Sequence, residues 1–162
     1  MSRSGLSDDC DEQWMLALYR ARVANATRGR RGQRFFRELL AALDAMPEKE
    51  LHAHTFDDGL VAGGDVVVDG GCCALGTLAR ARGMDITNAD PDDDSVAMDL
   101  AQIFDVADVL TREVIWANDE WSRSTPIKDD AGRTVGWKPE TPAERWTRMR
   151  SWVDAQIRKE AA

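Results

Sequence analysis

The stretch that most constrains the fold is residues 66–83, VVVDGGCCALGTLARARG. Its three consecutive valines are β-branched, which predicts a short buried strand. Asp69-Gly70-Gly71 predicts a tight turn, because glycine adopts positive φ without steric cost. From Cys72 the apolar residues recur at helical spacing, and Gly83 stands where a glycine that ends a helix is expected. Other helices must cover so small a strand–turn–helix unit.

Most of the remaining chain has the periodicity of amphipathic helices. Two helices, broken at Gly29–Gly32, are predicted to form an antiparallel pair within residues 7–46. A helix preceded by Ser95, a break at Asp105-Val106 and a further helix to Asp119 are also expected. Thr141-Pro142-Ala143-Glu144 is a capping box with proline at the first helical position.

These elements predict one mainly-α (α+β) domain, a compact helical unit with a small two- or three-stranded β element. The single domain spans residues 1–162 and has four parts. They are a helical hairpin (7–46), a β element with a helical core (51–119), an excursion or weak hairpin around Asp129–Gly132 (120–140), and a final helix (141–159).

Composition limits the compartment and the class of protein. No run of apolar residues is long enough to span a membrane and no signal peptide is visible, so a cytoplasmic protein without membrane contact is expected. Three cysteines do not form a disulfide framework, which agrees with a reducing compartment. Of six tryptophans, Trp137, Trp146 and Trp152 lie in the last quarter and predict a packed aromatic layer or an exposed anchor surface.

The net charge of −8 is divided unevenly along the chain. Residues 20–37 hold seven arginines and no acidic residue, whereas residues 57–119 hold fourteen acidic residues against three arginines, a net charge of −11. Such a division predicts interaction surfaces of opposite sign.

The cysteine pair allows a catalytic and a structural interpretation. A thiol in the first turn of a helix has a lowered pKa and could act as a nucleophile, so Cys72 or Cys73 could serve a hydrolase or transferase with His52 or His54 as base. Free cysteine is also among the most buried residue types, and this structural role is favoured. His52 and His54 have the spacing of half a metal site, but no second ligand pair accompanies them, so neither a metal nor a cofactor is predicted.

Two binding interpretations follow from the charges. Arg28, Arg30, Arg31 and Arg34 could contact phosphates in a nucleic-acid-binding accessory protein. Alternatively, carboxylates spread over a surface could imitate the phosphates of DNA and occupy the basic channel of a partner. The residues expected to make that second contact are Asp90, Asp92, Asp93, Asp94 and Asp99.

Several short motifs occur together in a familiar order: Cys73-Ala74-Leu75-Gly76, the helix containing residues 100–106, Asn118-Asp119, and Thr141-Pro142-x-Glu144-Arg145-Trp146. Over residues 66–157 this order resembles a loose family of small uncharacterised bacteriophage and bacterial proteins. The resemblance implies a compact helical module, often carried by phages.

Together these features predict a non-enzymatic, phage-encoded acidic interaction protein. It is expected to bind and inhibit a host protein, such as a nucleic-acid-handling defence complex, in the manner of an anti-CRISPR or a DNA mimic. It could also form a homo-oligomer.

Overall fold

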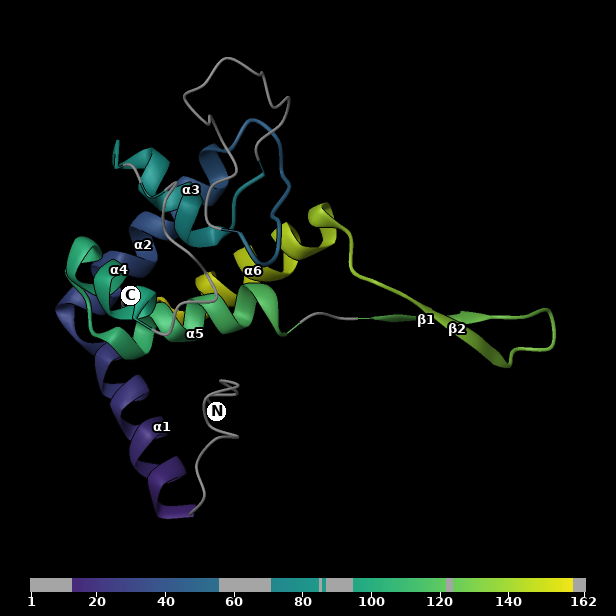
Figure 1. Ribbon diagram of the computed structural model, residues 1–162, viewed down its shortest axis with the longest axis horizontal. Coiled ribbons are helices and arrows are strands. Elements are labelled where there is room, and N and C mark those ends of the chain that lie inside the picture. Colours follow the sequence, from purple (N-terminus) through teal and green to yellow (C-terminus); the bar gives the residue numbers. More distant parts are fainter. Residues whose placement is uncertain (1–12, 56–70, 85, 87–94, 122–123, 159–162) are drawn as a thin grey trace.

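The computed structural model describes residues 13–55, 71–84, 86, 95–121 and 124–158. The described elements are helices and one two-stranded antiparallel sheet, which confirms the predicted mainly-α fold (Figure 1). In chain order they are α1 (Gln13–Arg28), α2 (Arg30–Ala45), α3 (Ala74–Ala81), α4 (Val96–Phe104), α5 (Asp108–Asp119), β1 (Thr125–Lys128), β2 (Thr134–Lys138) and α6 (Pro142–Gln156).

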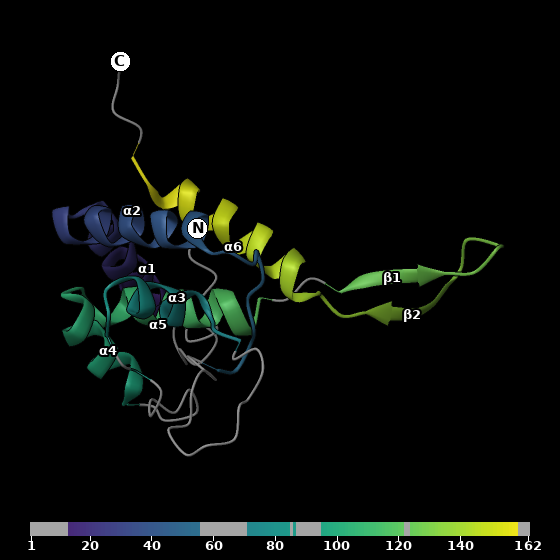
Figure 2. The same cartoon turned by 90° about the horizontal axis from the view of Figure 1, so that it is seen from above.

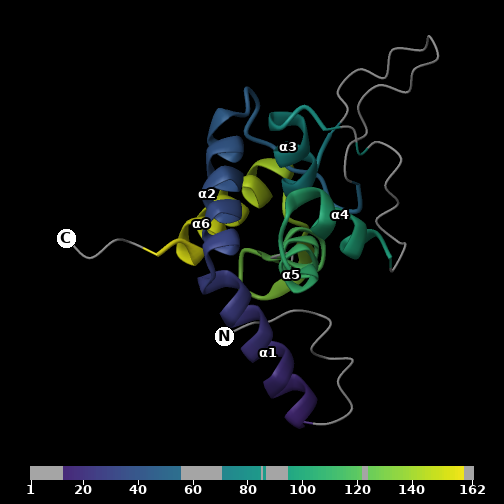
Figure 3. The same cartoon turned by 90° about the vertical axis from the view of Figure 1, so that its left-hand side faces the viewer.

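The body of the protein has two layers of helices. Helices α2 and α6 lie side by side, and α3, α4 and α5 form the second layer (Figures 2 and 3). The apolar stripe of α2 faces the second layer, as its periodicity predicts. The fully buried side chains at the centre include Phe35, Phe36, Leu39, Leu43, Leu75, Leu78, Phe104, Leu110, Val114 and Met149.

The first two helices do not form the expected antiparallel pair. The break falls at Gly29 alone, and α2 already begins at Arg30. With so short a connection, α1 cannot turn back along α2; it runs at an angle to α2 and packs against α5, with its N-terminal end pointing away from the body (Figures 1 and 3). Gly32 lies inside α2, where a Cβ atom would be 2.1 Å from the Ala26 carbonyl oxygen, so the junction requires glycine there.

Helix α3 is bounded as its sequence predicts, with its start shifted by two residues. Cys73 is the N-cap, and its sulfur accepts a hydrogen bond from the Gly76 amide. At the other end Gly83 has φ +67°, and the Met84 amide donates to the Ala79 carbonyl at 2.9 Å. This is the left-handed glycine ending that the sequence indicated.

The sheet of the described residues lies in a different place from the one expected. Residues 51–55 contain no strand, and the valine strand at 66–68 lies outside the described residues. The backbone of Leu51 bonds to α6 instead: its amide donates to the Pro142 carbonyl, and its carbonyl accepts from Arg145. The backbone groups of Leu51 are therefore taken by a helix end and a side chain, whereas the His52 amide donates to the Cys72 carbonyl at 3.1 Å.

The sheet forms within the expected excursion, as the hairpin predicted around Asp129–Gly132. Strands β1 and β2 pair antiparallel, with Pro126 opposite Trp137 and an irregularity after Ile127. The turn is closed by Asp129, whose carboxylate accepts from the Ala131 and Arg133 amides, while Gly132 adopts φ +75°. This hairpin, residues 125–138, is called the arm below; it projects from the body (Figures 1 and 2).

Helix α6 begins with the predicted capping box. The Thr141 hydroxyl accepts from the Glu144 amide, and the Glu144 carboxylate accepts from the Thr141 amide at 2.8 Å. Pro142 occupies the first helical position, where a missing N–H costs nothing.

Candidate functional site

The cysteine pair is buried in a structural setting. Cys73 is 3% exposed, and burial raises the pKa of its thiol well above the ordinary value. A thiol that stays protonated at neutral pH is a poor nucleophile. Cys72 is 4% exposed, and its sulfur lies 3.2 Å from the Thr77 hydroxyl.

The two histidines do not form the arrangement that catalysis or metal binding would need. The His52 ring packs over Gly71, where a Cβ atom would come within 2.3 Å of it. His54 has φ 55° and an exposed side chain, so the two imidazoles do not share a strand face. Among the described residues, no thiol–imidazole hydrogen bond and no cluster of three potential metal ligands is found.

Asn118 has a structural role that explains the Asn-Asp pair at the helix end. Its side chain is 1% exposed; its oxygen accepts from the Ala74 amide at 3.3 Å, and its nitrogen donates to the His52 carbonyl at 2.7 Å. Asp119 accepts from both the Asn118 side chain and the His54 amide. Asn118 and Asp119, at the end of α5, therefore hold the segment around His52 and the start of α3 together.

The two charged regions of the sequence partly face each other. Arg34 pairs with Asp105 at 2.6 Å, Arg31 with the same carboxylate group at 3.3 Å, and Arg22 with Asp108 at 3.5 Å. All of these groups are substantially exposed, so each pair contributes little to stability. These arginines and carboxylates are engaged within the chain.

The predicted contact residues therefore divide into distinct groups. Asp90, Asp92, Asp93 and Asp94 lie outside the described residues. Asp99 is exposed on α4 beside Met98 and Ile103, which are 48% and 42% exposed. Of the four arginines proposed to contact phosphates, Arg31 and Arg34 are paired as described, whereas Arg28 and Arg30 form no ion pair with a described residue.

The arm carries exposed apolar side chains on both of its faces, because Ile127 lies opposite Gly136 and the next residue of β2, Trp137, lies opposite Pro126. Ile127, Val135 and Trp137 are 48%, 63% and 64% exposed, and every residue of β1 is exposed. Lys128 and Lys138 end the two strands, and neither forms an ion pair with a described residue. The tryptophan count predicted an exposed anchor as one of two alternatives, and Trp137 has that exposure; Trp146 and Trp152 instead pack against the core.

The base of the arm is fixed to the body by buried charges. Glu140, which follows β2, accepts two hydrogen bonds from Arg148 at 2.6 and 2.9 Å, and both side chains are less than one-tenth exposed. Arg148 also donates to the Ala117 carbonyl at the end of α5. The arm therefore leaves the body from a fixed point.

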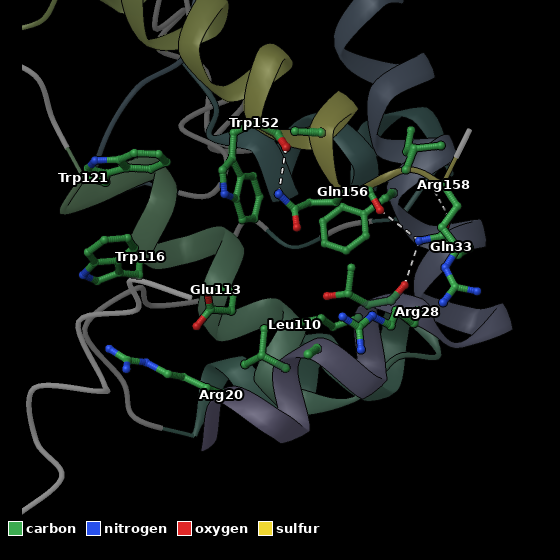
Figure 4. Close-up of a pocket in the computed structure, with 16 residues that line it drawn as sticks. Arg20, Arg28, Gln33, Leu110, Glu113, Trp116, Trp121, Trp152, Gln156 and Arg158 are labelled. Atoms are coloured by element: carbon green, nitrogen blue, oxygen red, sulfur yellow. Dashed lines mark hydrogen bonds between the residues drawn. The ribbon is translucent and has the colours of Figure 1, made fainter. Parts of the chain in front are cut away.

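A cleft of about 770 Å³ lies between α1, α2, α5 and α6 (Figure 4). Tryptophans and arginines from distant parts of the sequence line it, and the sequence alone did not single out this combination. Its main lining residues are Arg20, Arg28, Gln33, Glu113, Trp116, Trp121, Trp152 and Arg158.

Within the described residues, no helix is both long enough and apolar enough to cross a membrane. Comparison with models of known families, with characterised proteins and with solved structures found no match, so the phage-family resemblance stays a prediction.

Proposed function

We propose that this protein acts by binding another protein, without catalysing a reaction, and that the arm makes the principal contact. The observation that carries the proposal is the exposure of Ile127, Val135 and Trp137 on a hairpin that projects from the body. An isolated two-stranded hairpin is marginally stable in water. A partner that covers the face of the arm that carries Trp137 would stabilise the arm and bury apolar surface at once.

The chemistry of the arm defines the partner surface. Tryptophan is enriched among residues that dominate binding energy, because it fills a pocket with a large rigid side chain. Lys128 and Lys138 end the two strands, and neither is within ion-pair distance of a carboxylate of the described residues. The partner therefore offers an apolar pocket with an acidic rim.

The arm can be tested against a matched tryptophan. Trp137 is 64% and Trp14 61% exposed, on the arm and on α1 respectively. A partner captured from the native host by the wild-type chain is expected to bind Trp137→Ser at least about 30-fold more weakly, since truncating a dominant tryptophan costs about 2 kcal/mol or more. It is expected to bind Trp14→Ser as it binds wild type. Equal binding by Trp137→Ser would overturn the proposal.

The finer identity that we propose is an acidic inhibitor of a nucleic-acid-handling host complex. Its support is the net charge of −8, the acidic content of residues 57–119 and the exposure of Asp99 beside Met98 and Ile103. Charge complementarity of this kind mainly raises association rates. Reversal of Asp90, Asp92, Asp93 and Asp94 to lysine should then slow association and weaken its salt dependence. Unchanged association would remove the acidic surface from the proposal and leave the arm.

A further inference from the structure

The cleft between α1, α2, α5 and α6 has the features of a small-molecule site that the arm does not use. It is bounded on the α5 and α6 side by three tryptophans that are neither fully buried nor fully exposed (Figure 4). Trp116 and Trp121 stack with ring centroids 6.0 Å apart and planes 16° from parallel. Trp152 packs edge-on against Phe36 at 5.9 Å. Such a wall offers flat apolar surface to a ring.

The charges around the cleft are mostly positive. Arg20, Arg28 and Arg158 line it, and within the described part of the chain none of their guanidinium groups forms an ion pair. The one carboxylate in the lining, Glu113, is 5% exposed and accepts a hydrogen bond from the Tyr19 hydroxyl at 3.0 Å. A locally positive cleft in a protein of net charge −8 favours an anionic ligand.

Gln33 holds two walls of the cleft in place. This buried side chain donates to the Thr27 carbonyl at 2.8 Å and to the Gln156 carbonyl at 2.9 Å, and it accepts from the Arg158 amide at 2.8 Å. It therefore joins the α1–α2 junction to the end of α6 (Figure 4). The backbone that carries Arg28 and Arg158 is therefore held in place without a ligand, which lowers the entropic cost of binding.

We infer that this cleft binds a small anionic ligand with a planar ring, of the nucleoside monophosphate class. The ring packs against the indole wall, and the phosphate accepts hydrogen bonds from the guanidinium groups. Arginine suits phosphate because its planar fork donates two parallel hydrogen bonds. The volume of about 770 Å³ is in the range of small-molecule sites, which favours a mononucleotide over an extended acidic peptide.

Adenosine monophosphate, adenosine and inorganic phosphate are the probes for this inference. Calorimetry is expected to give tighter binding for the nucleotide than for either half. In a ¹H–¹⁵N spectrum, the indole signals of Trp116, Trp121 and Trp152 are expected to shift, while those of Trp14 and Trp137 stay in place. Phosphate binding as tightly as the nucleotide would overturn the role of the ring, and adenosine binding as tightly would overturn the role of the arginines.

Arginine variants provide the matched control. Arg28 and Arg30 are both exposed and lie two positions apart, but only Arg28 lines the cleft. Arg28→Ala is expected to weaken nucleotide binding about tenfold or more, since it removes a charge-assisted hydrogen bond to the phosphate. Arg30→Ala is expected to leave it unchanged. Equal effects of the two variants, no nucleotide binding at millimolar concentration, or tighter binding of a short acidic peptide would each contradict the inference.

Discussion

Glu140 and Arg148 form a bidentate ion pair at the base of the arm, with hydrogen bonds of 2.6 and 2.9 Å and both side chains almost entirely buried. Arg145 lies on the same carboxylate at 3.5 Å. The pair joins the end of the arm to α6, and through the Ala117 carbonyl to α5. This ion pair therefore fixes the position at which the arm joins the body.

Removal of the Glu140 charge should be strongly destabilising. Glu140→Gln leaves buried arginine charge uncompensated, and breaking a buried pair in this way costs about 3–5 kcal/mol. Urea denaturation measures the change. Asp44→Asn, which breaks the exposed bidentate pair with Arg150, is the control and should cost about 1 kcal/mol or less. Similar losses in the two variants would show that burial of the Glu140 pair has no energetic consequence.

Asn118 is expected to be essential to stability. Asn118→Ala leaves the buried Ala74 amide and the His52 carbonyl without their partner, at a cost of about 1–3 kcal/mol. Asn25→Ala, at an exposed position on α1, should change the free energy of unfolding by less than about 0.5 kcal/mol. If the two variants unfold at the same denaturant concentration, the side chain of Asn118 does not join these segments.

Cys73 should resist alkylation in the folded protein. Its pKa is raised because the thiolate would be buried, so the thiol stays protonated even at mildly alkaline pH, where a free cysteine of pKa about 8.5 reacts. Mass spectrometry of the iodoacetamide-treated protein should find Cys73 modified only after denaturant is added. Rapid modification of Cys73 in the folded chain would revive the nucleophile hypothesis.

The capping box should make stability depend on pH in the acid range. The hydrogen bonds from Thr141 lower the pKa of Glu144 from its ordinary value of 4.5, so the folded state holds the carboxylate more strongly than the unfolded state does. The stabilisation is complete above pH 4.5 and is lost as the pH falls through the folded pKa. Wild type should therefore exceed Glu144→Gln in stability at neutral pH, and the difference should shrink on acidification. A difference independent of pH would exclude this titration as its cause.

Local signals in the sequence predicted the helix ends best. The capping box at Thr141, the glycine ending at Gly83 and the turn at Asp129–Gly132 each depend on a few adjacent residues, and the structure confirms all three. The predicted antiparallel pairing of α1 and α2 was wrong. The angle between these helices depends on the one-residue connection at Gly29 and on the close approach of Gly32 to Ala26, which the sequence pattern does not indicate. The strand expected over residues 51–56 does not form at residues 51–55. There the backbone carbonyls of Leu51 and His52 accept from Arg145 and Asn118, and the Leu51 amide donates to the Pro142 carbonyl.

The candidate sites were less visible in the sequence than the helices. Arg20, Glu113 and Trp152 come from three different helices, and no local motif joins them; only the tertiary packing forms the cleft. The sequence shows that arginines and carboxylates are concentrated in different regions, but it does not show which of them form ion pairs. Asp105 lies at the end of α4, where a left-handed residue turns the chain and brings its carboxylate to Arg34 of α2.

Amide hydrogen exchange across residues 125–138 shows most sharply whether a partner covers the arm. In the free protein these amides should exchange quickly, because a two-stranded hairpin with exposed faces is marginally stable. With the captured partner bound, exchange in the arm is expected to slow strongly, and this slowing is expected to be lost in Trp137→Ser. Exchange in the arm that is the same with and without the bound partner would show that the arm is not the contact.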